Sequence, residues 1–598
     1  MFPCSTMPDL IVKTRNGAVS GSTMRSRKGA RILSFRGIPY ARPPVGDMRF
    51  RRSEPAQSWT GVLDGTKESK KCLQPNVLMP QLPFLTGGED CLYLNVYTKQ
   101  TKPSALLPVI VYIHGGAFVV GSCEAMLYGP QVLLDREVVM VGINYRLGAL
   151  GFLSLETDEA PGNLGLHDQY LALLWVRDNI AQFGGDPDNV TLMGVSAGAM
   201  SATCHLVSPI SRGLFHRVIA LSGTMASTFM HKDRSPRCYA VALASRLGYT
   251  GDKNDGRSLL SFLQTQSAST IVRAAAMFMD WDYANPMPWN PSRDSFSSQP
   301  FLPRGFTAAV QAREFSSVPV VFGLCRDEGL IYSAYFMQTK ARWELLRGDW
   351  TTWAPLLFFG RERDLATDSD KQTAADIGRY YFGQDTDISG LPSDDGTISK
   401  LTRIYSMSYF YSAAHHDASV LAKAGAQVHV FILTQPPDFS LMDLFRLDLK
   451  QLCWMFTARS FGYNPYPNHY GVCHGDDNNY LFPMEPPGFP PTVVTEDQKK
   501  VQNHLLNIVS SFARDGETGA VPVLGRVWEA VEAETGVSRY LRLDTNCSME
   551  EDTELRRELT FWDEVRLRAR MEDWEPGKEV PTILHNKIAI HRQKDSWF

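Results

Sequence analysis

The chain has 598 residues and a mass of 66.9 kDa, and 44% of its residues are hydrophobic while 21% are charged. This composition supplies enough apolar material for a large buried core. Sixty basic and sixty-four acidic residues leave a formal net charge of -4, so the chain as a whole does not attract nucleic acid or an anionic membrane. We therefore expect no nucleic-acid partner.

Cysteine content bears on metals and disulfides. Ten cysteines in so long a chain are too few for a scaffold held together by disulfides. None of them forms the Cys-x-x-Cys pair that is typical of a zinc or redox site. The sequence thus predicts no bound metal.

Localisation and membrane attachment follow from hydrophobic runs. Residues 1–10 lack the basic start and the apolar run of a secretory signal. No uninterrupted apolar stretch of about 18 residues or more is present, so we expect no membrane span. The expectation is a cytoplasmic protein, or a secreted one if the true N-terminus is missing.

Short apolar runs rich in β-branched residues recur along the chain and are predicted to form buried strands. These runs are Val109–Ile113, Val138–Ile143, Val190–Val195, Val218–Leu221, Val318–Phe322 and Val428–Leu433. Helix-like segments follow several of them, notably Asp168–Phe183 and Ala197–Val207. Such alternation builds a mainly parallel sheet with helices on both faces, so the sequence predicts an open α/β fold.

Later segments complete the predicted domain. A capping box at Thr495 and Gln498, apolar residues at helical spacing and a stop at Gly516 predict an amphipathic helix. Residues 224–317 and 332–427 lack the strand pattern and are interpreted as insertions packed over the sheet. The charged segment after Ser548 is expected to be helical. We expect one domain over residues 1–598, with a loosely held tail from about residue 572.

The pentapeptide Gly194-Val195-Ser196-Ala197-Gly198 matches the G-x-S-x-G nucleophile elbow. Its glycines are needed because the turn from strand to helix is too tight for β-carbons. Such a pentapeptide arises by chance in about a quarter of chains of this length, so its context decides. A strand-like run precedes it and a helix-compatible run follows it, as the elbow requires.

Upstream, the run Val109–Ile113 ends in His114-Gly115-Gly116-Ala117-Phe118, a small-residue loop of the HGGG type. In such a loop the amides of Gly116 and Ala117 converge with that of Ala197 on the oxyanion formed when a carbonyl is attacked. The alternative interpretation is an ordinary glycine turn.

With these motifs the chain resembles the type-B carboxylesterases, the α/β-hydrolase family that includes cholinesterases and insect juvenile hormone esterases. The resemblance extends over nearly the whole chain. Its specific segments are Phe35–Ala41, Glu89–Val96, Asn163–Gln169, Trp175–Val176 and Phe183–Gly198. It implies an α/β-hydrolase fold with a large, mostly parallel central sheet and helical insertions over the active site.

The resemblance also implies the other triad residues. Arg326-Asp327-Glu328-Gly329 is similar to the family's acid motif, and Gly471-Val472-Cys473-His474-Gly475 to its histidine motif. The order Ser196, Glu328, His474 agrees with that of α/β-hydrolases. On chemistry alone Asp327 competes with Glu328, because either carboxylate is able to orient an imidazole.

By the same resemblance Cys72 and Cys91 are expected to form a disulfide that closes the loop between them. The alternative is two buried thiols. A disulfide implies an oxidising compartment, which conflicts with the missing signal sequence.

The implied activity is hydrolysis of small to medium hydrophobic carboxylic esters through an acyl-enzyme, without metal or organic cofactor. The partner is then a small-molecule ester, and the sequence does not indicate an oligomeric state. One alternative is a lipase acting on aggregated acylglycerols. Another is a non-catalytic adhesion protein of the neuroligin kind, which shares the fold but typically lacks a complete triad and carries a membrane span.

Two differences from the family pattern and a set of apolar side chains bear on substrate preference. The loop from Cys72 to Cys91 contains no Trp, where cholinesterases place an indole for the quaternary ammonium, so choline esters are disfavoured. Val195 stands where many relatives place Glu or Gln. Apolar side chains suited to a hydrophobic substrate, or equally to core packing, are Met277, Phe278, Met279, Trp281, Trp289, Phe336 and Met337.

Overall fold

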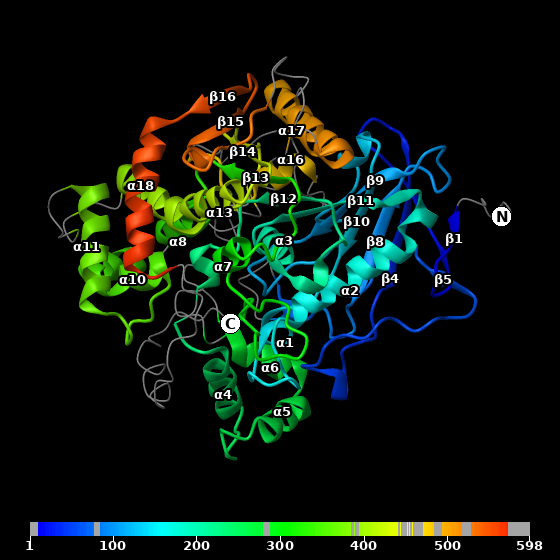
Figure 1. Cartoon of the computed structure of the whole chain (residues 1–598), viewed down its shortest axis with the longest axis horizontal. Helices are drawn as coiled ribbons and strands as arrows, with labels where there is room; N and C mark the ends of the chain where they lie inside the picture. The colour runs from blue at the N-terminus through cyan, green and yellow to red at the C-terminus, as the bar shows by residue number, and fades with distance from the viewer. Residues whose placement is uncertain are drawn as a thin grey trace.

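The computed structural model describes residues 10–76, 84–231, 233–276, 278, 288–338, 340–383, 388, 391, 394–440, 443, 451, 454, 457–458, 470–482, 493–516 and 528–571. Within these residues an eleven-stranded sheet runs through the centre of the molecule (Figure 1), in the order β16-β15-β14-β13-β12-β11-β9-β10-β8-β4-β3.

The central strands are parallel. They are β9 (Leu107–Ile113), β10 (Val139–Ile143), β11 (Gly185–Val195), β12 (Arg217–Leu221), β13 (Val320–Cys325), β14 (Val428–Leu433) and β15 (Arg539–Leu543). Each of the six predicted apolar runs forms one of these strands. Every residue of β10, β13 and β14 is buried, because helices cover both faces of a parallel sheet.

Antiparallel strands at one edge were not predicted. They are β3 (Ser22–Arg25), β4 (Arg31–Pro39) and β8 (Tyr93–Thr98). The family-like segments that begin at Phe35 and Glu89 belong largely to β4 and β8, where Phe35 pairs with Val96. The register shifts next to Gly37, whose φ of 63° and N–H donated to Asn95 Oδ1 at 2.9 Å make the bulge.

Two hydrophobic cores lie on opposite faces of the sheet. Along β9, Val109, Val111 and Ile113 belong to one core, while Ile110 and Tyr112 belong to the other. Helices α2 (Leu164–Asn179) and α3 (Ala197–Val207) cover the first core, and α17 (Glu496–Asp515) covers the second. The alternation follows from the period of two along a strand.

Three helix predictions are confirmed with small differences. Helix α3 has the predicted bounds, and α2 starts earlier than expected and continues as a 3-10 turn, Ile180–Phe183. Helix α17 has the predicted capping box, with Thr495 Oγ1 accepting from the Gln498 amide at 3.2 Å, and it ends at Gly516 with φ 69°.

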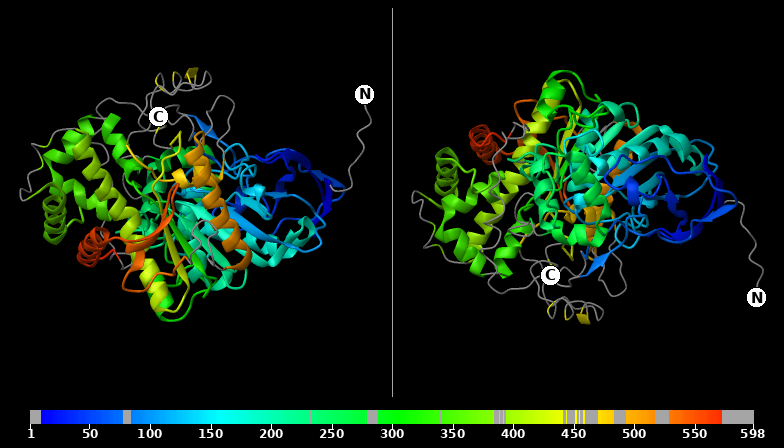
Figure 2. Two further views of the ribbon diagram at one scale, coloured as in Figure 1. Left: turned by 90° about the horizontal axis from the view of Figure 1, so that it is seen from above. Right: turned by 90° about the horizontal axis from the view of Figure 1, so that it is seen from below.

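Both predicted insertions are helical in the described residues. The first holds α4 (Pro236–Arg246), α5 (Gly256–Thr265), α6 (Ala268–Ala276) and α7 (Phe306–Gln311). The second overlaps α8 (Leu330–Gln338) and holds α9 (Lys340–Gly348), α10 (Trp350–Phe359), α11 (Asp368–Phe382), α12 (Asp395–Ser406), a π-helix (Met407–Tyr411) and α13 (Ser412–Lys423). Helices α10 and α11 lie far from the N-terminal strands rather than over the middle of the sheet (Figures 1 and 2).

The C-terminal segment differs from the prediction. Ser548–Glu551 forms the antiparallel edge strand β16, because it pairs with β15, and the expected helix follows as α18 (Thr553–Arg568). The predicted loose tail from about 572 lies outside the described residues.

Cys72 and Cys91 form a disulfide, with their Cα atoms 4.9 Å apart, as the resemblance implied. Among the described helices, none combines the length and the apolar character needed to cross a membrane.

Candidate active site

Ser196 occupies the sharp turn between β11 and α3. Its φ of 56° and ψ of -124° are rare for a residue with a side chain, and the strain is held by its neighbours. The Ser196 amide donates to the Leu221 carbonyl at 2.8 Å, and the Ser196 carbonyl accepts from the Met200 amide at 2.9 Å. The predicted elbow is therefore present.

The two glycines of the elbow are required by close contacts. A β-carbon on Gly194 would lie 2.3 Å from the Gly198 carbonyl carbon, and one on Gly198 would lie 2.0 Å from the Ile113 carbonyl oxygen. Both atoms belong to the backbone, so they are not able to move away as the end of a side chain would. Thus α3 packs directly on the end of β9, which brings the Ser196 turn next to the glycine loop.

The predicted oxyanion loop lies against Ser196. A β-carbon on Gly115 would be 3.1 Å from Ser196 Cβ. Gly116, Ala117 and Phe118 have positive φ values of 111°, 56° and 61°, so the chain curls back, and the amides of residues 119 and 120 both donate to the Gly116 carbonyl. The Ala197 amide is the first of α3 and has no partner within the helix.

The His114 side chain, at the start of this loop, stabilises it. Its Nδ1 lies 2.8 Å from the Gly115 carbonyl, and its ring stacks on Tyr145 with centroids 4.4 Å apart. Burial lowers the pKa of His114 to about 4. The neutral imidazole therefore donates Nδ1–H to the Gly115 carbonyl at neutral pH.

Glu328 and His474 meet although 146 positions separate them: His474 Nδ1 lies 2.8 Å from Glu328 Oε2. The Glu328 side chain is fully buried, and its Oε1 accepts from the Cys325 amide at 2.8 Å. Only 5% of His474 is exposed. The contact resembles the acid-histidine half of a catalytic triad, with the carboxylate fixed at one oxygen by backbone.

Asp327, the chemical alternative to Glu328, points elsewhere. Its Oδ2 accepts from the Val472 amide and from Arg326 Nε, both at 2.9 Å. The structure thus brings Glu328, and not Asp327, to the imidazole.

A π-helix supports this half of the site. Tyr411 donates its hydroxyl to the carbonyls of Cys325 and Arg326 at 3.1 and 3.3 Å. The Phe410 ring lies 4.6 Å from the His474 ring between centroids. The wider turn of a π-helix aims consecutive residues at the acid loop and at the imidazole, and such turns are frequent at functional sites. The sequence contains no signal for it.

Two buried carboxyls, Asp476 and Asp477, follow His474 in the chain. Asp476 accepts hydrogen bonds from Ser440 Oγ at 2.8 Å and from the Cys473 amide at 2.7 Å, and burial raises its pKa. Burial, and next the charge of Glu328, raise the pKa of Asp477 to about 8. Asp477 Oδ2 has no hydrogen-bond partner among the residues that the structure describes. We infer that the Asp477 carboxyl is mostly protonated at neutral pH, which leaves less negative charge to oppose that of Glu328.

Thiols near the site are not rival nucleophiles. Burial raises the pKa of Cys325 and of Cys473 well above the usual range. Both therefore stay protonated, and a thiol is a much weaker nucleophile than a thiolate.

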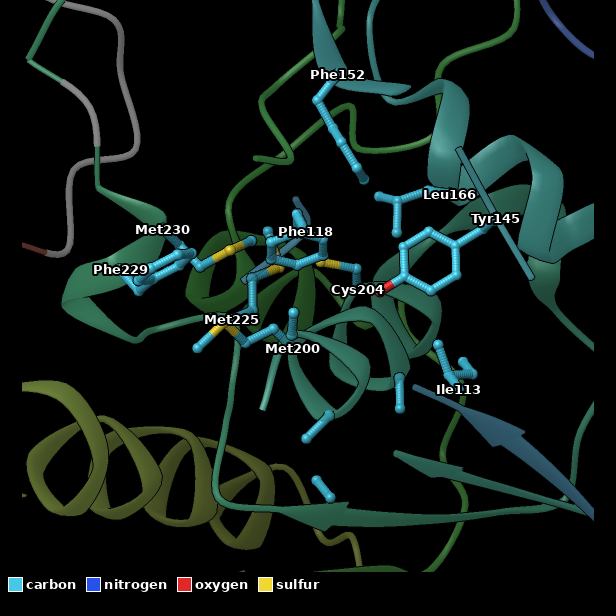
Figure 3. Packing of buried hydrophobic residues seen from close by; sticks show 14 of the residues in the cluster. Ile113, Phe118, Tyr145, Phe152, Leu166, Met200, Cys204, Met225, Phe229 and Met230 are labelled. Carbon is cyan, nitrogen blue, oxygen red and sulfur yellow. The ribbon is translucent and has the colours of Figure 1, made fainter. Parts of the chain in front are cut away.

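Apolar side chains gather beside the elbow (Figure 3). Met200 lies one turn after Ser196 on α3, and Figure 3 shows it close to Phe118 and Met225, with Phe229 and Met230 to one side. The Phe118 and Phe229 rings stack with centroids 6.5 Å apart. The sequence did not single out these side chains as candidates for a substrate pocket.

Of the apolar side chains that were predicted to suit a hydrophobic substrate, Trp289 and Phe336 are core residues. Trp289 donates Nε1–H to the Ala275 carbonyl at 3.1 Å and packs edge-to-face on Phe278, and Phe336 is buried near Tyr405. The core-packing interpretation holds for these two. Met277, Met279, Trp281 and the side chain of Met337 lie outside the described residues. Within the described part of the chain, no group of three or more His, Cys, Asp or Glu residues is arranged to hold a metal ion.

The family model described as the carboxylesterase family matches residues 8–562. The chain belongs to the carboxylesterase family. Esterase FE4 of Myzus persicae is 33% identical to it over 521 residues, which cover 86% of this chain and 86% of that esterase. The para-nitrobenzyl esterase of Bacillus subtilis is 41% identical over 335 residues, covering 54% of this chain and 64% of that enzyme.

A solved structure agrees with this membership. Juvenile hormone esterase from Manduca sexta superposes with a TM-score of 0.76 at 26% identity, covering 93% of this carboxylesterase and 99% of the other chain. The fold is that of an α/β-hydrolase, as predicted. Together these findings identify the chain as a carboxylic ester hydrolase.

Proposed function

We propose that this carboxylesterase works as a serine hydrolase, with Ser196 as nucleophile, His474 as general base and acid, and Glu328 as the residue that orients the imidazole. His474 Nε2 takes the proton from Ser196 Oγ, and the oxygen attacks the ester carbonyl. The alcohol leaves with that proton, and water activated by the same imidazole releases the acid. The observation that carries the proposal is the 2.8 Å contact between His474 Nδ1 and Glu328 Oε2.

The sheet supports bringing the third residue to this pair. Ser196 follows β11 and Glu328 follows β13, and β12 lies between these two parallel strands. Two strand spacings amount to about 10 Å. An imidazole with a hydrogen bond at each nitrogen spans roughly 8 Å, which suits a bridge between the two side chains.

The developing negative charge needs donors, and we assign this role to the amides of Gly116, Ala117 and Ala197. The positive φ values of the loop turn its amides away from regular secondary structure, and the closeness of Gly115 to Ser196 supports the assignment. Removing one such donor typically costs 10²–10³-fold in kcat.

The substrates we propose are small to medium carboxylic esters with a hydrophobic acyl or alcohol group. Phe118 and Met200 adjoin the oxyanion loop and the nucleophile in sequence, and both are buried among apolar side chains. Methionine side chains adapt their shape to an apolar ligand. The Manduca sexta juvenile hormone esterase structure has OTFP covalently attached, which agrees with a covalent intermediate here.

The test uses p-nitrophenyl butyrate with the wild-type chain, Ser196→Ala and the control Ser510→Ala, whose hydroxyl lies on α17. We expect Ser196→Ala to lose about 10⁴-fold or more in kcat, because the nucleophile is removed, and Ser510→Ala to match the wild type. After incubation with an organophosphate, intact-protein mass spectrometry should show one adduct on the wild type and on Ser510→Ala.

Hydrolysis that survives in Ser196→Ala would refute the serine mechanism. An organophosphate adduct on that variant would place the nucleophile at another residue.

A further inference from the structure

Two loops of this esterase are joined by a pair of hydrogen bonds next to Glu328 and His474. The Asp327 amide donates to the Val472 carbonyl at 2.9 Å, and Asp327 Oδ2 accepts from the Val472 amide at 2.9 Å. The backbone and the side chain of Asp327 thus bind the carbonyl and the amide of Val472. Because Asp327 precedes Glu328 by one residue and Val472 precedes His474 by two, this clamp sets the spacing of the triad's acid and base.

Gly471 makes room for the clamp. A β-carbon at this position would lie 2.1 Å from Asp327 Oδ2, and the Gly471 φ of 137° also disfavours any other residue. The carboxylate therefore reaches the Val472 amide only because residue 471 has no side chain.

The remaining contacts of the clamp are weaker or more local. Arg326 Nε lies 2.9 Å from Asp327 Oδ2, but half of the Arg326 side chain is exposed, and an ion pair at such a place contributes little. The bond from the Cys473 amide to Asp476, which spans His474 in the chain, stays within the histidine loop. Among these contacts, the two bonds to Val472 are those that join the histidine loop to the acid loop.

We propose that Asp327 is a positioning residue, which holds the His474 loop at the distance from Glu328 that proton transfer requires. The proposal rests on the function proposed above, since it takes Glu328 and His474 as members of the triad. A displacement of about 1 Å in a catalytic group is able to lower a rate 10²-fold. Loss of the clamp is therefore expected to reduce kcat without a change in substrate binding.

The experiment compares Asp327→Ala, Asp327→Asn and the control Asp158→Ala with p-nitrophenyl butyrate. Like Asp327, Asp158 accepts hydrogen bonds from a backbone amide and an arginine, but in another part of the molecule: its Oδ1 accepts from the Ser298 amide at 3.0 Å and from Arg52 at 2.8 Å. We expect Asp327→Ala to lose about 10- to 100-fold in kcat with KM within twofold of the wild type. Asp327→Asn keeps an acceptor oxygen for the Val472 amide and should restore kcat to within about threefold.

Asp158→Ala should keep the wild-type kcat even where its melting temperature falls as much as that of Asp327→Ala. Gly471→Ala keeps Asp327 but pushes its carboxylate away from the Val472 amide. It should lower kcat as Asp327→Ala does, and it serves as the second variant if Asp327→Ala does not fold.

A wild-type kcat in both Asp327→Ala and Gly471→Ala would overturn the proposal, as would equal losses in Asp327→Ala and Asp158→Ala. The two proposals fail separately. Activity in Ser196→Ala contradicts the serine mechanism, whereas an inactive Ser196→Ala together with a fully active Asp327→Ala contradicts only the positioning role.

Discussion

At the scale of single residues, the site depends on glycines that leave no space for a β-carbon. Gly116 combines a φ of 111° with a backbone atom in the way, because a β-carbon would lie 2.1 Å from the Val120 carbonyl oxygen. Gly248 has a similar φ of 100°, but no atom of the described part of the chain lies within 4 Å of where its β-carbon would be. Alanine at Gly248 would suffer backbone strain alone, whereas alanine at Gly116 would also collide with the Val120 carbonyl. Comparing the two separates these effects.

We predict that Gly116→Ala lowers kcat on p-nitrophenyl butyrate by about 10²-fold or more, because the proposed oxyanion amides shift when residue 116 moves away from Val120. Gly248→Ala should lower the free energy of unfolding by about 1–2 kcal/mol, the cost of a left-handed alanine, and leave kcat unchanged. Steady-state kinetics and urea unfolding check both. Equal kcat values for the two variants would contradict the collision argument.

The acid of the site is a residue that local sequence does not specify. Asp327 and Glu328 are adjacent carboxylates, and chemistry alone allows either of them to orient an imidazole. Which one faces His474 depends on how the loop after β13 is folded, and that loop is held by contacts from distant segments.

At the scale of elements, the π-helix Met407–Tyr411 is the device that the sequence did not reveal. It places Tyr411 on the acid loop, whereas Tyr409 in the same turn donates its hydroxyl to the Leu357 carbonyl at 2.9 Å, away from the acid loop. A π-turn has the same apolar composition as an α-turn, so hydrophobic periodicity does not distinguish them.

We predict that Tyr411→Phe and Tyr409→Phe each lower the free energy of unfolding by about 1 kcal/mol, since each removes one hydroxyl donor, which Tyr411 shares between two carbonyls and Tyr409 gives to one. Only Tyr411→Phe should also lower kcat, by about three- to tenfold, because only its hydroxyl holds the carbonyls of residues 325 and 326 beside Glu328. Denaturant unfolding and kcat on p-nitrophenyl butyrate measure the two effects. A drop in kcat of the same size in Tyr409→Phe would show that the element acts through overall stability instead.

At the scale of the whole molecule, the fold encloses several histidines in their neutral form. Burial lowers the pKa of five of them to about 3 or 4, namely His114, His167, His205, His415 and His429. Each takes up its proton near pH 6.5 when unfolded. Between about pH 6.5 and 4 the unfolded chain thus binds more protons than the folded one, and stability falls as the pH falls through this window.

Buried carboxyls act in the opposite direction. Burial raises the pKa values of Asp294, Glu362, Asp476 and Asp477 in the folded state, so their contribution is full in acid and is lost as the pH rises through the folded-state pKa. These four groups offset only part of the effect of the five histidines. We therefore expect net destabilisation in mild acid.

The corresponding prediction concerns His205, whose Nδ1 contacts Ser211 Oγ at 2.8 Å and whose Nε2 contacts Gln169 Oε1 at 3.1 Å. His205→Gln should reduce the slope of the unfolding free energy against pH, between pH 6 and 4, by about 1.4 kcal/mol per pH unit, because one titrating proton is removed. Urea unfolding at several pH values measures the slope.

The control for that measurement is Ser211→Ala, which removes a partner of His205 but not the titrating group. It should lower stability at every pH and leave the slope unchanged. An unchanged slope in His205→Gln would mean that His205 is not neutral in the folded state.

The sequence by itself determined six of the seven central strands, the elbow at Ser196, the glycine loop and helix α17, because apolar periodicity, glycine spacing and helix caps act over a few neighbouring residues. Resemblance to a family added the disulfide and the candidate acid and histidine. Only the tertiary structure decided which carboxylate meets the imidazole, how Asp327 clamps Val472 and which edge strands join the sheet. These depend on contacts between segments far apart in the chain, such as the 146 positions between Glu328 and His474, which no local pattern encodes.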